Sequence, residues 1–460
     1  MSGTSGQRAT GAREEEKAPG DGAAPAGRGR LRGLALDTRP LAHPAYRRVL
    51  VGQGAAVIGT MLTEVAVSVQ IYSLTHSSFY VGLAGLCGFA PLVVFGLWGG
   101  AVADAVDRRL LYLCSSLVTW AATLALLAQT LAGAGSAALI LALIAVQGAG
   151  FAVSSSTRGA LVPAIVPRHL VPSANTLIYS VGNVGQVLGP LTAGALVTLP
   201  HGFAYAYGAD ALLFTASLHS TLRLPTLRPA DGVARPGARA VWEGLRFIGG
   251  NPVLLMSFAV DIAAMVLAMP EALFPQAAAV RFHGGVGLLY SAVAIGSMLA
   301  ALCSGWIGRV RRQGAVLACA VVAWAVAIAL AGLAGSLWLA VLLLALAGAA
   351  DLVSAVYRQT ILQTYASDGM RGRMQGVYTV VVAGGPRLGD LRAGGMAAAT
   401  SFGVAWSGSA LLCAVLVAAA AVAVRPFWHY RPPAAGPQGA PGVPPGAAPA
   451  PQDDAAWRVE

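Results

Sequence analysis

Long apolar runs are the feature of this sequence that most limits its fold. Most runs hold about 20 or more residues, enough for a helix to cross roughly 30 Å of hydrocarbon. Inside hydrocarbon every backbone N–H and C=O group has to be paired within the protein, so only helices and closed barrels cross it. The runs are rich in Ala, Leu and Gly and lack the alternation of barrel strands. With 56% hydrophobic and 11% charged residues over 460 positions, a water-soluble fold is excluded and membrane-spanning helices are predicted.

The runs fall into two sets of six. The first set is Leu50–Leu74, Phe79–Ala103, Leu110–Leu131, Ser136–Ser156, Pro172–Leu199 and Phe203–Leu222. The second set is Val253–Val280, Gly287–Ile307, Ala315–Gly335, Leu337–Val356, Met374–Ala398 and Ser401–Val424. We therefore predict an all-α integral membrane protein with twelve transmembrane helices in two six-helix halves, residues 46–222 and 253–424, built as parallel repeats around a cavity. Residues 223–252 are predicted to form a cytoplasmic central loop containing an interfacial helix, and residues 1–45 and 425–460 to be disordered cytoplasmic tails.

The placement of arginine sets the predicted orientation. Arginines gather at both ends and in alternate connections: Arg47, Arg48, Arg108, Arg109, Arg158, Arg168, five positions from Arg223 to Arg246, Arg309, Arg311, Arg312, Arg371, Arg373, Arg425 and Arg431. The opposite connections carry only Arg281. The positive-inside rule then places both termini in the cytoplasm. This topology also accounts for the net charge of +11, so nucleic acid is not an expected partner.

The sequence lacks clusters of residues that could bind a metal ion. The seven histidines are scattered, and the five cysteines include no C-x-x-C spacing. The sequence also contains no glycine-rich phosphate loop and no nucleophile elbow. We therefore expect no metal, no cofactor and no enzymatic activity.

The connection between the second and third spans carries a short charged motif. Its residues are Gly100, Asp104, Asp107, Arg108 and Arg109. The motif resembles the major facilitator signature G-x-x-x-D-[RK]-x-G-x-[RK]-[RK], with Ala105 in place of a basic residue and Asp107 in place of a glycine. That variant resembles the drug:proton antiporter-3 branch, which includes enterobactin exporters and macrolide efflux proteins. The resemblance implies a gate in which Asp104 holds one conformation closed; the alternative is a charged loop that only fixes topology.

The fifth span carries small residues at helical spacing. Gly185, Gly189, Pro190 and Gly194 resemble the antiporter motif that ends in G-P-x-x-G-G, with Ala193 in place of one glycine. Glycines let helices approach closely, and a proline allows a bend, so the helix is able to adopt two packings. The resemblance implies export, with plain helix packing as the alternative.

The second half also resembles the enterobactin-exporter group. The likeness rests on residues 242–248 (Trp-Glu-Gly-Leu-Arg-Phe-Ile), Asn251-Pro252-Val253, Asp261, Met269-Pro270, Asp351 and residues 384–390 (Gly-Gly-Pro-Arg-Leu-Gly-Asp). It covers nearly all twelve spans. The resemblance implies a bacterial inner-membrane transporter, whereas the substrate differs among relatives of this kind.

Several ionisable residues lie inside apolar runs, where a central charge costs about 2.5–3.5 kcal/mol and so requires a partner or a function. Glu64 lies near the middle of the first span with no basic residue within one turn. We expect Glu64 to bind and release a proton. Polar packing with Gln53 or Gln70 and substrate contact are the alternatives.

Two further acids lie in the seventh span. Asp261 and Glu271 are ten residues apart, roughly 15 Å along a helix, so they cannot act as one carboxylate pair. Asp261 is expected either to pair with an Arg of another span or to take part in coupling. Glu271 follows Met269-Pro270, and a kink there either turns the carboxylate inward or leaves it at the outer rim.

Basic residues accompany acids in the tenth and eleventh spans. Arg387 and Asp390 are three apart, a spacing that favours an intrahelical ion pair or, when the pair opens, binding of an anionic group by Arg387 or Arg392. A cytoplasmic gate is predicted from a second set of residues, Asp351, Arg358, Arg371 and Arg373.

Together these features predict a proton-coupled exporter of a small amphipathic molecule, either a siderophore or an antibiotic-like metabolite, working by alternating access as a monomer in the lipid bilayer. An importer or permease of a small metabolite is the first alternative. A receptor or scaffold would need a sensor domain or docking segment, and a membrane enzyme would need clustered catalytic residues.

Overall fold

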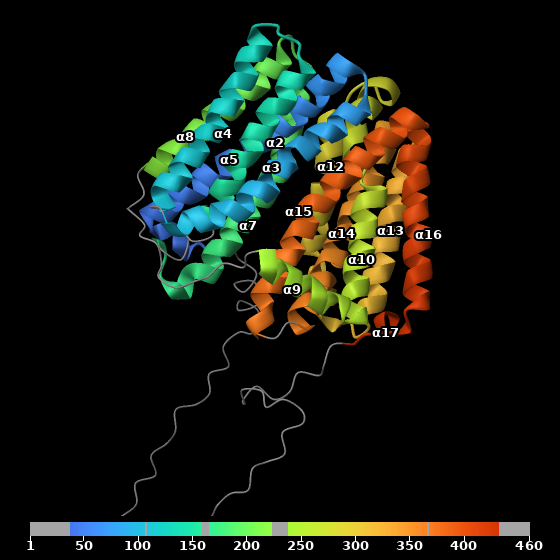
Figure 1. Cartoon of the computed structure of the whole chain (residues 1–460). Coiled ribbons are helices and arrows are strands. Elements are labelled where there is room, and N and C mark those ends of the chain that lie inside the picture. The colour runs from blue at the N-terminus through green and yellow to red at the C-terminus, as the bar shows by residue number, and fades with distance from the viewer. Residues whose placement is uncertain (1–36, 106–107, 159–164, 223–237, 366–367, 432–460) are drawn as a thin grey trace, which may run out of the picture.

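The structure is a computed structural model, and it describes residues 37–105, 108–158, 165–222, 238–365 and 368–431 (Figure 1). Within these residues the regular elements are helices, and no strand is found. The long helices run alongside one another in two groups, and the first and last described residues lie toward the same end of the molecule (Figure 1). The predicted all-α fold is confirmed.

The first group holds the helices before residue 223. They are η1 (Arg39–Ala42), α2 (Pro44–Thr75), α3 (Ser78–Ala105), α4 (Arg108–Leu131), α5 (Ala137–Arg158), η2 (Arg168–Leu170), α7 (Val171–Leu196) and α8 (Gly202–Leu222). Helix α2 begins at Pro44, whose fixed φ suits the first turn, and ends at His76 in the left-handed conformation. Helices α7 and α8 pack against α2, while α3 and α4 pack against α5.

The second group follows residue 237. Its elements are α9 (Ala238–Gly249), α10 (Pro252–Ala268), η3 (Glu271–Leu273), α11 (Phe274–Gln276), η4 (Ala277–Arg281), α12 (Val286–Leu302), η5 (Ser304–Arg309), α13 (Gln313–Leu333), α14 (Leu337–Tyr365), α15 (Asp368–Ala399), η6 (Val404–Gly408), α16 (Ser409–Ala423) and α17 (Arg425–Trp428). Helix α14 packs against α12 and α13, and α10 packs against α15 and α16. The largest apolar core lies in this group and is rich in Ala, Leu and Val.

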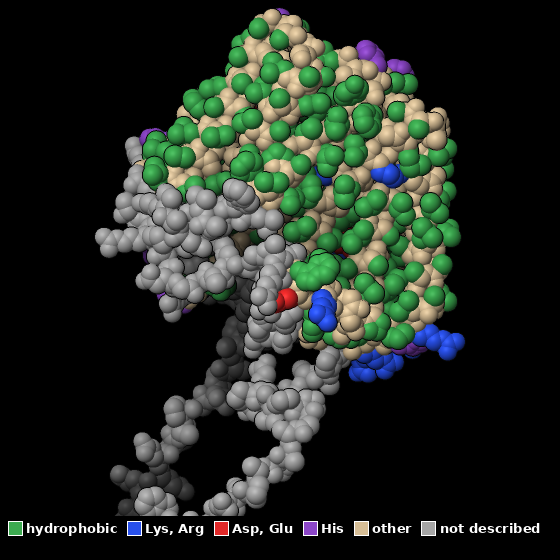
Figure 2. Space-filling view, in the orientation of Figure 1, with side chains coloured by type: hydrophobic (Ala, Val, Ile, Leu, Met, Phe, Trp, Pro, Cys, Tyr) green, Lys and Arg blue, Asp and Glu red, His purple; other side chains and the backbone are tan. Residues whose placement is uncertain are grey.

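Each of the twelve predicted spans coincides with a helical segment of the structure. In the described part of the chain, eight of these segments are long and apolar enough to cross a membrane, and α12 is a shorter apolar helix. Figure 2 shows a face covered largely by hydrophobic side chains, with most charged side chains near α9 and α17. The protein is therefore a multi-pass membrane protein, and the full count of twelve crossings stays a prediction.

One predicted span is broken. Helix α10 ends at Ala268, and Met269 is extended, because Pro270 disfavours a helical residue before it. The chain continues through the 3₁₀ turn η3, the short helix α11 and the π-helical turn η4. The break matters for the site, because it places Glu271 at the start of a new turn.

The two groups of helices meet toward the end of the molecule opposite to the termini (Figure 1). Helix α3 packs against α15, and α7 packs against α12. At the second crossing, a Cβ atom added to Gly194 would lie 2.6 Å from the Cα atom of Gly287, so both positions require glycine. Near this end, Ser78 of α3 donates a hydrogen bond from Oγ to Oε1 of Gln276, at 2.8 Å. These contacts join the groups on one side of a cavity.

Candidate functional site

A cavity of about 510 Å³ lies between the two groups of helices. This volume is in the range of small-molecule sites, about 300–1,000 Å³. Helices α2, α3 and α5 supply one wall, and α15, η3 and Tyr290 of α12 supply the other. The charged side chains of the lining are Glu64, Glu271, Arg387 and Asp390. Four of the five residues predicted for proton or substrate binding thus lie at one site, and Asp261 lies elsewhere.

Glu64 and Arg387 form an ion pair across this cavity. Nη2 of Arg387 on α15 lies 2.7 Å from Oε1 of Glu64 on α2, so the pair joins the two groups of helices. The side chains are 35% and 28% exposed. An ion pair that solvent reaches has a net stabilising effect of about 0–1 kcal/mol, so a ligand or a proton is able to replace this contact at small cost. Gln70, one of the two alternative packing partners of Glu64, instead bonds to Thr130 and Tyr207.

Asp390 and Glu271 extend the site away from this pair. Oδ1 of the buried Asp390 accepts a hydrogen bond from the backbone N–H of Ala272, at 3.0 Å. The carbonyl oxygen of Glu271 accepts a hydrogen bond from the hydroxyl of Tyr290, at 3.1 Å. The expected ion pair between Arg387 and Asp390 is therefore not the arrangement found: Asp390 caps η3, and Arg387 reaches α2. Three carboxyl groups share the cavity with one guanidinium group.

Asp261 and Arg358 form a second ion pair, inside the second group of helices. The pair joins α10 to α14, and the two side chains are only 4% and 3% exposed. The guanidinium carbon of Arg358 also lies 6.0 Å from the ring centre of Tyr378. Neither residue lines the cavity. Asp351 and Arg358 were expected to act in one gate, and in the structure Arg358 takes Asp261 as its ion-pair partner.

The glycines of α7 contact both groups of helices. Gly185 lies against Val57 of α2, and Gly189 lies against Met61 of the same helix. The carbonyl of Pro190 and the backbone of Gly194 lie against Gly287 of α12. The predicted antiporter motif thus sits where the two groups meet on this side of the molecule.

Two predicted sets fall outside the described side chains. Gly100 and Asp104 are in the helical part of α3, and Arg108 and Arg109 begin α4, but their side chains are not described, and Asp107 lies in the gap at 106–107. The side chains of Arg371 and Arg373, at the start of α15, lie outside the described set as well. Their roles as gating residues stay predictions.

One buried acid was missed by the sequence analysis. Asp210 of α8 is 1% exposed and lies close to the cavity wall. Its Oδ2 atom accepts hydrogen bonds from the hydroxyls of Thr63, at 2.6 Å, and Thr123, at 3.2 Å. The signal was present, because Asp210 is the only acid in the apolar run Phe203–Leu222.

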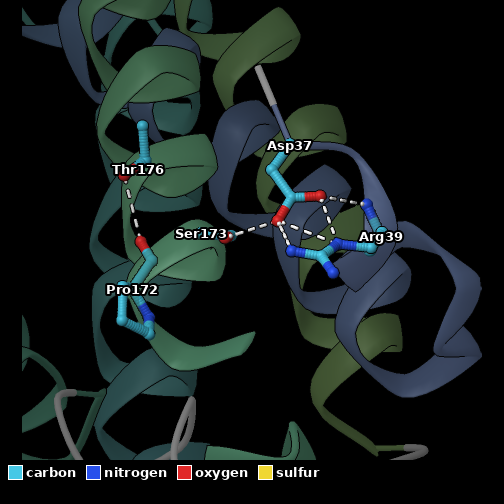
Figure 3. A network of polar contacts seen from close by, with 5 residues as sticks. All are labelled: Asp37, Arg39, Pro172, Ser173 and Thr176. Carbon is cyan, nitrogen blue, oxygen red and sulfur yellow. Dashed lines mark hydrogen bonds and ion pairs between the residues drawn. The ribbon is translucent and has the colours of Figure 1, made fainter. Parts of the chain in front are cut away.

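A polar network joins Asp37 and Arg39, which precede the first span, to the first turn of α7. Figure 3 shows the Asp37 carboxylate between Arg39 and Ser173. Arg39 donates from Nε, at 2.9 Å, and from Nη2, at 2.8 Å, and the Ser173 hydroxyl donates at 2.7 Å. Mainly the hydrogen bonds from Arg39, with help from Ser173, hold the pKa of the Asp37 carboxyl well below its usual range.

This arrangement, a charged cavity between two groups of long apolar helices, defines a secondary transporter of the major facilitator type. The chain shares its fold with the nucleoside transporter NupG, at a TM-score of 0.66 and 14% identity, over 84% of this chain and 100% of that one. A bacterial homologue of the human lysosomal transporter Spinster, in an inward-facing and unoccupied conformation, matches at a TM-score of 0.62 and 16% identity, over 84% and 96%. At these identities the likeness concerns the fold alone.

The chain belongs to the family described as "Transmembrane secretion effector", whose profile matches residues 36–431. Among curated proteins it is 28% identical to the enterobactin exporter EntS of Citrobacter koseri, over 77% of this chain and 86% of that one. It is also 28% identical to EntS of Escherichia coli O81, with the same coverage. The predicted membership of the enterobactin-exporter branch of the major facilitator superfamily is confirmed.

Proposed function

We propose that the protein exports a siderophore or a related amphipathic metabolite from a bacterial cell in exchange for protons. Its monomer would alternate between inward-open and outward-open states by moving residues 46–222 against residues 253–424 in the inner membrane. Both termini would lie in the cytoplasm, where the arginine-rich connections are expected. The relatives named enterobactin exporters support the direction and the substrate class.

The ion pair between Glu64 and Arg387 is the observation that carries this proposal. Because it joins helices of both groups across the cavity, protonating Glu64 removes one contact that holds α2 to α15. Substrate that binds Arg387 competes for the same contact. A proton on Glu64 and a substrate on Arg387 would thus each replace this contact, and exchange would follow if the two are bound in alternate states.

The cavity chemistry also supports an amphipathic substrate. Apolar side chains such as Phe89, Leu92 and Ile144 provide surface for rings, while Arg387 offers a guanidinium fork to acidic oxygens. A catechol group carries both an aromatic ring and such oxygens. Glu64, Glu271 and Asp390 would limit the number of anionic groups that the site accepts, unless protons enter with them.

Transport in liposomes tests the proposal. The full chain is reconstituted with a pH-sensitive dye in the lumen, and enterobactin is the probe. We expect enterobactin movement to be coupled to proton movement in the opposite direction, and Glu64→Gln to lower the coupled flux at least about tenfold, which corresponds to about 1.4 kcal/mol. Asp37→Asn removes a carboxylate outside the cavity and serves as the matched control. Equal proton and enterobactin flux in Glu64→Gln and the control would reject the role of Glu64.

Import of a small metabolite is the second candidate, because the same fold is found in a solved D-xylose-proton symporter, at a TM-score of 0.62 and 13% identity. The two candidates differ in the direction of coupling. Under an imposed proton gradient, an exporter moves its probe against the proton current and a symporter moves it along. Accumulation of enterobactin in the direction of the proton current would favour import.

A further inference from the structure

A second carboxyl group lies behind the cavity wall, within the first group of helices. Asp210 of α8 has hydroxyl partners, Thr63 and Thr123, and forms no ion pair with any described residue. A buried carboxylate without a cation is costly, so the uncharged form is an accessible state of such a group. Asp210 therefore differs from Asp261 and Glu64, which each have an arginine partner.

The helices around Asp210 bring no positive charge to it. Helix α8 packs against α2, α4 and α7. On α2 and α4 the arginines lie at the start of each helix, 14 or more residues from Thr63 and Thr123, or about 20 Å along the axis. Other ionisable groups on these helices are either engaged elsewhere or distant along the chain. Glu64 pairs with Arg387, and Tyr207 bonds to Gln70. Tyr179 of α7 is 75% exposed, and the remaining two are Cys114 of α4 and His219, nine residues further along α8.

Two side chains connect Asp210 with the cavity. Thr63 lines the cavity and donates its hydroxyl hydrogen to Asp210 at 2.6 Å. Gln147 also lines the cavity, and its Nε2 atom donates to the hydroxyl of Thr123, at 3.1 Å, which is the second partner of Asp210. The carboxyl is thus one hydroxyl away from the space that Glu64 faces.

The backbone of α2 leaves room for the other carboxyl oxygen. A Cβ atom at Gly59 would collide with Oδ1 of Asp210, so glycine is required at this position. Oδ1 is buried and has no hydrogen-bond partner among the described residues. Oδ2 accepts both hydroxyl hydrogens, so the negative charge of the ionised carboxylate is stabilised at one oxygen only.

We propose that Asp210 is a second proton-binding residue of this transporter, loaded from the cavity through the hydroxyl of Thr63. In the loading step Thr63 passes its hydroxyl proton to Oδ2 of Asp210, while its own oxygen takes a proton from a hydronium ion in the cavity; release reverses both transfers. Thr63 and Glu64 are neighbours on α2, so this helix contacts α8 through one proton site and α15 through the other. The assignment rests on the proton-coupled transport proposed above, whereas its test needs no substrate.

Infrared difference spectroscopy of the full chain in liposomes tests the assignment. Spectra are recorded over an acid-to-alkaline titration, and the C=O stretch of protonated buried carboxyl groups is followed. We expect a titrating band that is lost in Asp210→Asn and kept in Glu64→Gln. Asp210→Glu retains a carboxyl and should shift the frequency of the band, which identifies it independently if Asp210→Asn fails to fold.

Thr63 variants separate the relay from plain packing. Thr63→Val keeps the shape and removes the hydroxyl. We expect it to raise the titration midpoint by about one pH unit, because the carboxylate loses a donor, and to slow the appearance of the band after a jump to acidic pH, because the relay is gone. Thr63→Ser keeps the hydroxyl and should restore the wild-type midpoint. A spectrum without an Asp210-dependent band, or with one that is the same at every pH, would overturn the proposal. Enterobactin exchange is measured separately, so its absence would reject the proposed function and leave the Asp210 assignment intact.

Discussion

Two arginine–carboxylate pairs join helices of this protein in opposite surroundings. Glu64 and Arg387 link the two groups of helices at a cavity and are about one-third exposed, whereas Asp261 and Arg358 link two helices of one group and are almost fully buried. In the first pair solvent is able to replace either partner, so the contact can open and close at small cost. In the second pair a lost partner leaves a bare charge in the core. The same chemistry therefore makes a contact that opens easily in one place and a permanent contact in the other.

The buried pair should give the largest effect. Arg358→Met leaves Asp261 without its cation, and we expect the free energy of unfolding to fall by about 3–5 kcal/mol. Thermal unfolding in detergent, followed by tryptophan fluorescence, measures this loss. The double variant Asp261→Leu with Arg358→Met should recover most of it, since both charges are then gone. A loss below about 1 kcal/mol in the single variant would mean that the buried pair contributes no more to stability than the exposed pair of Glu64 and Arg387.

Asp390 offers an intermediate case, because it is buried and also lines the cavity. Asp390→Ala leaves the N–H of Ala272 unpaired, and we expect a loss of about 1–3 kcal/mol in the free energy of unfolding. Asp390→Asn keeps an oxygen that accepts this hydrogen bond and should lose much less. The same unfolding measurement compares them, and equal losses would show that the cap on η3 is unimportant.

The pair at the cavity should affect stability least of the three. In a double-mutant cycle of Glu64→Gln and Arg387→Gln, we expect a coupling energy of about 0–1 kcal/mol, and raising the salt concentration should reduce it. Enterobactin exchange should nevertheless fall in both single variants. A coupling energy of several kcal/mol that salt does not change would mean that this contact is as fixed as the buried one.

Asp37 gives the smallest effect and a defined pH dependence. Its pKa is lowered in the folded protein, so the contact with Arg39 and Ser173 contributes stability above the ordinary carboxyl pKa, about 4, and loses it as the pH falls toward the lowered value. The hydrogen-exchange protection factor at residues 37–43, which corrects the rate for the intrinsic pH dependence of amide exchange, should therefore be constant from neutral to mildly acidic pH. Asp37→Asn should have a slightly lower protection factor that does not change with pH, and a loss of protection in the wild type already near neutral pH would contradict the assignment.

The spans and the acids inside them were predictable, because a long apolar run and a charge within it are visible without a structure. Glu64, Glu271, Arg387 and Asp390 were all singled out for this reason, and the structure places them around one cavity. The family was also readable from motifs such as Gly189-Pro190. The break at Pro270 was anticipated as a kink, since proline removes a backbone donor.

The partners of these residues were not predictable from spacing. Arg387 and Asp390 are three residues apart and share a helix face, yet Arg387 reaches α2 and Asp390 reaches the turn created by the break. Such contacts depend on how separate helices are placed relative to one another, and the spacing of residues within one helix does not determine this. Asp210 is visible in the sequence as an acid inside an apolar run, but its partners, Thr63 and Thr123, come from distant parts of the chain and could not be predicted.

The meeting of Gly194 and Gly287 has a mechanical consequence. Main chain lies directly on main chain there, so no side chain at the crossing is able to swing aside and admit a single water or ion. Separation at this point requires movement of whole helices, which breaks many contacts at once and makes leakage of single waters or ions costly. A crossing of this kind is either closed or fully separated, which would suit the proposed exchange because a half-open state would let protons leak.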